Sequence, residues 1–111
     1  MAKAIDPRHA LGIRGEKLAR KFLVKQGCKF IAANVATEQG EVDLIVLDRG
    51  TLVFVEVKTR SDEGFASGED AVTPEKQRRI QALARYFINV NHLQEFPCRF
   101  DVIVVTTNGP K

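Results

Sequence analysis

The sequence predicts a single α/β domain in which a mixed central β-sheet is flanked by helices. Its 111 residues amount to about one domain of chain. Apolar residues recur at helical spacing near both 8–26 and 73–89, and short stretches rich in Val, Ile, Leu and Phe lie between and after them, as in strands. The expected order is α-β-β-β-α-β, and strands interleaved with helices are typical of a covered sheet. We expect one domain over residues 1–111, with its core at about 8–106.

The first helix is expected over residues 8–26, followed by Gly27 as a C-cap. Its apolar residues recur at helical spacing: Leu11, Leu18, Ala19, Phe22 and Leu23. On a helical wheel the arc from Leu18 to Leu23 is expected to be buried, and Glu16 lies about 20° beyond Leu23. A carboxylate at the edge of a buried face is not an ordinary surface charge.

Three strands are expected next, over residues 28–35, 41–48 and 51–60. Arg49 and Gly50 join the second and third strands as a hairpin. Both of these strands are apolar on both faces, as central strands covered by helices are.

The last third of the chain is expected to form a loop, a helix and a strand. Residues 61–72 are rich in Gly, Ser and acids and predict a mobile loop. Thr73, Pro74 and Glu75 mark the start of a helix that runs to about residue 89. A strand over 98–106 completes the order. On the helix, Tyr86 and Phe87 are interpreted as core residues rather than as residues that stack on bases.

Charged residues interrupt the otherwise apolar second and third strands. Alternation places Glu56 and Lys58 on one face, about 7 Å apart along the strand. A turn centred on residues 49 and 50 pairs residues whose numbers sum to about 99, so Asp43 lies opposite Glu56. Opposed carboxylates repel unless a cation lies between them, and such oxygen ligands suit Mg²⁺. The alternative is an ion-pair cluster in which Lys58 neutralises Glu56 or Asp43, although burying charges for structure alone seldom adds stability.

Five stretches carry a family resemblance. They are Gly12 to Glu16, Gly40 to Ile45 (GEVDLI), Val53 to Arg60 (VFVEVKTR), Ala71-Val72 with Lys76 and Arg79, and Arg99 to Val102 (RFDV). Together they strongly resemble the YraN-like family of small bacterial predicted endonucleases. Through that family the chain resembles the restriction-endonuclease-like superfamily, and archaeal Holliday-junction resolvases in size and layout.

The resemblance implies a nuclease site. Asp43 and Glu56 would bind Mg²⁺ or Mn²⁺, Lys58 would assist the attacking water, and Glu16 would complete the metal ligands and the catalytic set. Weaker candidates for nucleic-acid contacts are Arg60, Lys76, Gln77, Arg78 and Arg79. The expected function is a metal-dependent endonuclease acting on DNA, including branched or structured DNA. A DNA-binding module without useful catalysis and an ordinary structural protein are the alternatives.

Composition bounds the partners and the compartment. The net charge of +3 and the pI of about 9.1 suit a polyanion without specifying one. The sequence shows no dimer interface, although a homodimer would widen the recognition surface. Two cysteines without CxxC spacing argue against a disulfide scaffold or a zinc site. No apolar run approaches the ~20 residues of a membrane span, and no secretory signal is expected, so the expected location is cytoplasmic.

Overall fold

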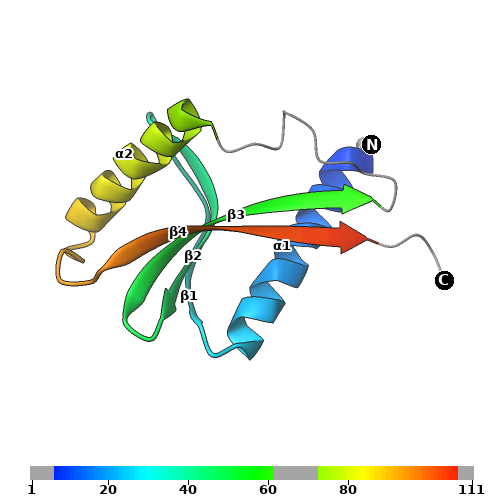
Figure 1. Cartoon of the computed structure of the whole chain (residues 1–111), viewed down its shortest axis with the longest axis horizontal. Coiled ribbons are helices and arrows are strands. Elements are labelled where there is room, and N and C mark those ends of the chain that lie inside the picture. Colours follow the sequence, from blue (N-terminus) through cyan, green and yellow to red (C-terminus); the bar gives the residue numbers. More distant parts are fainter. Residues whose placement is uncertain (1–6, 62–72, 108–111) are drawn as a thin grey trace, which may run out of the picture.

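The computed structural model describes residues 7–61 and 73–107, and the side chains of 14–60 and 73–106. Its elements are α1 (Pro7–Lys25), β1 (Lys29–Thr37), β2 (Gly40–Asp48), β3 (Thr51–Ser61), α2 (Pro74–Val90) and β4 (Cys98–Thr107) (Figure 1). The predicted order α-β-β-β-α-β is confirmed. Of the predicted loop at 61–72, Ser61 ends β3 and the remainder lies outside the described residues.

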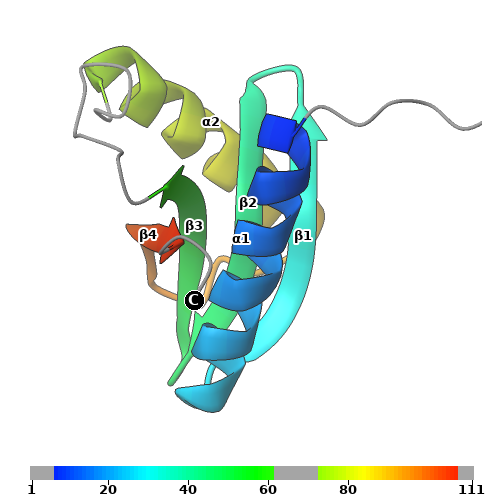
Figure 2. The same ribbon diagram turned by 90° about the vertical axis from the view of Figure 1, so that its right-hand side faces the viewer.

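The four strands form one mixed sheet in the order β1-β2-β3-β4. The β1–β2 and β2–β3 pairs are antiparallel, whereas β4 runs parallel to β3. Helix α1 covers one face of the sheet and α2 covers the other (Figure 2). From Leu44 to Val46 of β2 and from Leu52 to Val55 of β3, successive residues therefore belong to different cores in turn. Leu44 and Val55 pack with Ala19 of α1, while Ile45 and Phe54 pack with Leu83 of α2.

The β2–β3 turn fixes the register that the site depends on. Arg49 and Gly50 have φ angles of 51° and 85°, both positive, as the tightest two-residue hairpin turns require. The strand pairs run from Asp48↔Thr51 to Leu44↔Val55, so residue numbers sum to 99 throughout. The predicted register is confirmed as far as Leu44↔Val55, one step before positions 43 and 56.

Both predicted helix ends next to the sheet have the expected caps. After α1, Cys28 N–H donates to the Leu23 carbonyl at 3.0 Å and Gly27 N–H donates to Val24 at 3.0 Å, which is a Schellman motif. Before α2, the Thr73 hydroxyl accepts the Lys76 backbone N–H at 3.1 Å. This cap fixes the first turn of α2 and, with it, the position from which Lys76 extends.

The predicted buried face of α1 is partly wrong. Ala19 is buried and Leu23 half-buried, but the exposed fractions of Leu18 and Phe22 are 46% and 54%. The reason is steric. The helix lies closest to the sheet at its smallest side chains, and a Cβ on Gly15 would overlap the side chain of Thr59 in β3. The contact between α1 and the sheet is centred on Gly15 and Ala19, so the larger Leu18 and Phe22 face away from it.

Replacing Gly15 with alanine should therefore lower the free energy of unfolding by about 1–2 kcal/mol, because overpacking exceeds the gain in helix propensity. Three atoms of Thr59 lie close to the added methyl group, and rotation of the threonine side chain moves only two of them, because its Cβ stays in place. Urea unfolding of Gly15→Ala, Thr59→Ala and the double variant measures the coupling. We expect the double variant to recover part of the loss; two purely additive effects would contradict this close approach.

Candidate active site

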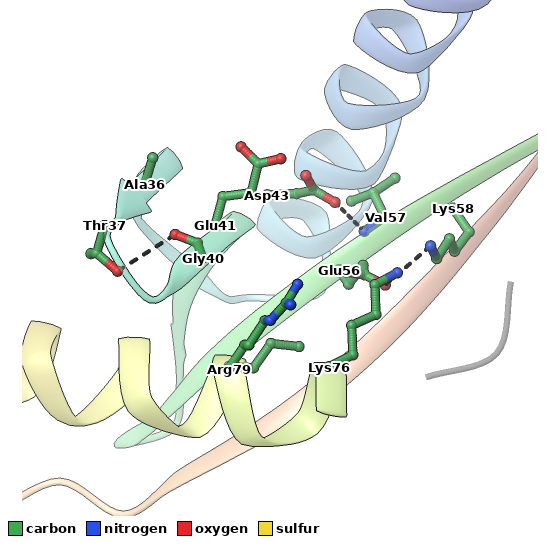
Figure 3. A pocket seen from close by; sticks show the side chains of 11 residues that line it. Ala36, Thr37, Gly40, Glu41, Asp43, Glu56, Val57, Lys58, Lys76 and Arg79 are labelled. Atoms are coloured by element: carbon green, nitrogen blue, oxygen red, sulfur yellow. Dashed lines mark hydrogen bonds and ion pairs between the residues drawn. The ribbon is translucent and has the colours of Figure 1, made fainter. Parts of the chain in front are cut away.

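A cavity of about 640 Å³ opens between the β1–β2 hairpin, β3 and the first turns of α2 (Figure 3). Asp43, Glu56 and Lys58 all line it. Lys76 and Arg79 line it from α2. Carboxylates from two strands and cations from a strand and a helix thus meet in one space.

The cavity exists because β2 and β3 separate at this point (Figure 1). Their paired residues end at Leu44↔Val55. One step further, the Asp43 side chain takes the place of a strand neighbour: its Oδ2 accepts the Val57 backbone N–H at 2.7 Å. This bond anchors the carboxylate and satisfies a backbone donor of β3.

Glu56 is the centre of an ion-pair cluster. Its Oε2 lies 3.2 Å from the Lys58 Nζ and 3.4 Å from the Lys76 Nζ. The exposed fractions of the Glu56 and Lys58 side chains are 15% and 19%, whereas that of Lys76 is 37%. Lys58 therefore pairs with Glu56. This is one of the two pairings that the ion-pair alternative allowed for Lys58. The second cation from α2 was not expected at that oxygen.

Asp43 is the carboxyl group whose environment opposes its charge. Burial raises the pKa of Asp43 above its ordinary value, and the charges of Glu56 and Glu41 raise it further. The Val57 N–H and the charge of Lys58 act in the opposite direction and lower this pKa in part. The ionised form of Asp43 thus costs folding free energy, and a nearby cation would reduce that cost.

These residues fit a hard divalent cation. Carboxylate oxygens from Asp43 and Glu56 are ligands that Mg²⁺ prefers, and Mg²⁺ needs only one or two carboxylates because it retains water and takes phosphate oxygens. Two ammonium groups already lie on Glu56 Oε2, which marks this oxygen as a site that attracts cations. Asp43 and Glu56 would hold the ion.

The structure does not bring Glu16 into this group. Glu16 is half-buried on α1 beside Gly15, and it is not among the described residues that line the cavity. Within residues 14–60 and 73–106, no three His, Cys, Asp or Glu side chains form a group that could hold a metal ion. The role of Glu16 as a metal ligand and catalytic residue stays a prediction.

The predicted nucleic-acid contacts divide into two groups. Lys76 and Arg79 line the cavity, and Arg79 also pairs with Glu75 at 2.7 Å on the exposed side of α2. Arg60, Gln77 and Arg78 do not line it. Arg60 is half-buried on β3, Arg78 is exposed, and Gln77 lines a separate hollow with Phe100 of β4.

Sequence reasoning missed the contribution of the β1–β2 hairpin. Ala36, Thr37 and Gly40 form the wall of the cavity opposite α2. Thr37 is paired with Gly40 in the hairpin, and its Oγ1 accepts the Gln39 backbone N–H at 3.0 Å. The signal available in the sequence was the tight turn Thr37–Gly40, directly before the strand that carries Asp43.

The family model described as "Uncharacterised protein family UPF0102" matches residues 15–105, which contain every element of the site. The chain belongs to this family. The resemblance to YraN-like proteins is thereby confirmed. A family protein of Symbiobacterium thermophilum is 45% identical over 95 residues, covering 86% of this chain and 80% of that protein. One from Neisseria gonorrhoeae is 37% identical over 102 residues, covering 92% of this chain and 89% of that protein.

Among solved structures, this chain is similar to a repair endonuclease from Pyrococcus abyssi. The likeness has a TM-score of 0.43 and 14% identity, and it covers 96% of this chain and 42% of that one. A likeness this distant carries no weight on function. In the described part of the chain, no helix is long and apolar enough to cross a membrane.

Proposed function

We propose that this member of the UPF0102 family is a metal-dependent endonuclease that hydrolyses phosphodiester bonds in DNA. The observation that carries the proposal is the convergence of Asp43, Glu56 and Lys58 in one cavity, although they come from two strands and are spaced as D-x(12)-E-x-K. A restriction-endonuclease-like fold and a preference for branched or structured DNA belong to this proposal. So do Mg²⁺ or Mn²⁺ as cofactor, with Asp43 and Glu56 as ligands.

Several charged residues of the cavity have a role in this chemistry. Lys58, Lys76 and Arg79 attract the phosphate backbone into a space that three carboxylates also line, those of Glu41, Asp43 and Glu56. Bound Mg²⁺ or Mn²⁺ would neutralise charge on the phosphate oxygens and lower the pKa of a water molecule. Asp43 is held in position by the Val57 N–H.

Lys58 could act as a general base that removes a proton from the attacking water, or it could stabilise charge and position the water. Its ion pair with Glu56 favours the second role. At 3.2 Å from Glu56 Oε2, its amine is placed as an ammonium group. An ammonium group can donate hydrogen bonds to the equatorial phosphate oxygens or to the water, but it has no lone pair with which to remove a proton. We therefore assign Lys58 to charge stabilisation and positioning rather than to general-base catalysis.

The test is incubation of the pure protein with linear, nicked, flapped and four-way DNA in Mg²⁺, Mn²⁺ or EDTA. We expect cleavage of at least one substrate with a metal ion and none in EDTA. Cleavage that persists in EDTA would contradict the metal-dependent proposal.

A DNA-binding module without catalysis is the second candidate. The double pairing of Glu56 with Lys58 and Lys76 favours it, because the charge of this carboxylate is balanced without a metal ion. Such a module would bind DNA equally well in EDTA and Mg²⁺ and cleave none of the four substrates.

A homodimer and a cytoplasmic location are further proposals. Two free cysteines, Cys28 and Cys98, support the latter, and sedimentation velocity tests the former.

Replacing Lys76 with methionine should increase the affinity for Mn²⁺ by up to about fivefold, which is the range of a partly exposed ion pair. The Lys76 ammonium group lies 3.4 Å from the Glu56 oxygen that a metal ion would take, so the two cations compete. Electron paramagnetic resonance of free Mn²⁺ measures the dissociation constant. Arg85→Met, which removes the same charge from an exposed position of α2, is the matched control. An equal gain in both variants would indicate a general effect of net charge.

A further inference from the structure

A second hollow of about 430 Å³ adjoins the candidate active site. It is lined by Tyr86 of α2 and by residues 36–39 at the tip of the β1–β2 hairpin. Ala36 and Thr37 line both this hollow and the active-site cavity, so the two spaces share this stretch of β1. A single extended ligand could therefore occupy both.

The two spaces differ in chemistry. The active-site cavity is lined by three cations, Lys58, Lys76 and Arg79, as suits a phosphate group. Among the residues that the structure describes, the lining of the second hollow contains no lysine or arginine; it contains an aromatic ring, a hydroxyl, an amide and a carboxylate. An aromatic face stacks on any base, and side chains such as those of Gln39 and Glu38 hydrogen-bond to base edges. The second hollow suits a nucleobase.

Tyr86 is free of the core, which corrects its interpretation as a core residue. The exposed fraction of Tyr86 is 56%. Its neighbour Phe87 packs instead against Phe54, with ring centroids 6.1 Å apart and an interplanar angle of 89°. Adjacent helical residues point about 100° apart, so only one of the two rings can face the sheet.

Tyr86 also aligns with a cation of the active site. Arg79 and Tyr86 are seven residues apart on α2, hence within about 20° of the same side of the helix and about 10.5 Å apart along its axis. Arg79 extends from α2 toward Gly40 and Glu41 at the start of β2 (Figure 3). The same side of α2 thus presents a cation at one space and an aromatic ring at the next.

From this arrangement we propose that the second hollow binds an unstacked nucleobase of the strand whose phosphate enters the active site, with Tyr86 as the stacking surface. This inference rests on the proposed function and names its substrate class. A base in a regular duplex is already stacked and paired, so it cannot enter. Single-stranded, flapped or branched DNA presents such a base at little cost.

The test uses a short single-stranded oligonucleotide containing 2-aminopurine, whose fluorescence falls on stacking, and the matching duplex. Ca²⁺, which takes the same kind of oxygen ligands, is present throughout. The variants are Tyr86→Ala, Tyr86→Phe and Phe22→Ala. Phe22 is 54% exposed on α1, which covers the other face of the sheet, and so is a control of similar exposure.

We expect Tyr86→Ala to weaken single-strand binding roughly 5- to 100-fold and to abolish the fluorescence change. Duplex binding should change less than twofold, and Tyr86→Phe and Phe22→Ala should behave like the wild type. Equal losses for single strand and duplex, or no loss for either, would overturn this inference and leave the proposed nuclease function standing. A wild type that binds none of these DNAs would overturn both.

Discussion

Replacing Lys58 with alanine should lower the rate of metal-dependent DNA cleavage by about 100- to 1000-fold, the usual cost of losing one donor to transition-state charge. Lys58 is mostly buried in the cavity wall and lies beside Glu56. DNA binding should stay near wild type because Lys76 and Arg79 still face the phosphate. Single-turnover cleavage at saturating protein measures the rate, and fluorescence anisotropy measures binding.

The matched control for Lys58→Ala is Lys21→Ala, which removes an exposed lysine from α1, the helix on the opposite face of the sheet. We expect this control to cleave at the wild-type rate. Cleavage that survives Lys58→Ala would assign the activity to another site or to a contaminating nuclease. A loss of affinity as large as the loss of rate would make Lys58 a phosphate anchor instead.

Local signals in the sequence were sufficient for the elements and for the core of the site. A two-residue turn leaves only one pairing for the strands that it joins, so Arg49 and Gly50 determined the register of β2 and β3. The juxtaposition of Asp43 and Glu56 followed from that register. The start of α2 was similarly determined by Thr73, whose side chain caps the helix.

Contacts that depend on how helices lie on the sheet could not be predicted. The hydrophobic pattern of α1 favoured its large residues, but close approach at Gly15 selected the small ones. The pairing of Lys76 with Glu56 requires the position of α2 relative to β3, which no spacing in the sequence encodes. In the same way, the Asp43 side chain could pair with a lysine or with the backbone, and the separation of β2 from β3 favours the Val57 N–H.

Asp43→Asn should keep or raise the melting temperature in EDTA at neutral pH. The amide can still accept the Val57 N–H, and the substitution removes a charge that burial and two neighbouring carboxylates oppose. Because the folded-state pKa of Asp43 is raised, its protonated form stabilises the fold at low pH, and that contribution is lost as pH rises through this pKa. Any gain in melting temperature of Asp43→Asn over the wild type should therefore shrink as pH falls toward 4. Melting curves across the pH range measure this.

The difference in melting temperature between the wild type and Asp43→Asn should depend more strongly on metal ions than on pH. At about ten times its dissociation constant, Mn²⁺ should stabilise the wild type by about 1.4 kcal/mol, which is several degrees in melting temperature. Asp43→Asn should lose most of that rise, because one of the two carboxylate ligands proposed in the cavity is gone, and should cleave DNA at least about 100-fold more slowly. Glu41→Gln removes an exposed carboxylate from the same cavity and should retain both the rise in melting temperature with Mn²⁺ and the cleavage rate.

If Asp43 served only as a partner of Lys58, Asp43→Asn would instead lower the free energy of unfolding by about 3–5 kcal/mol in EDTA. That loss, together with a wild type whose melting ignores Mn²⁺, would reduce the proposed metal site to a salt-bridge cluster.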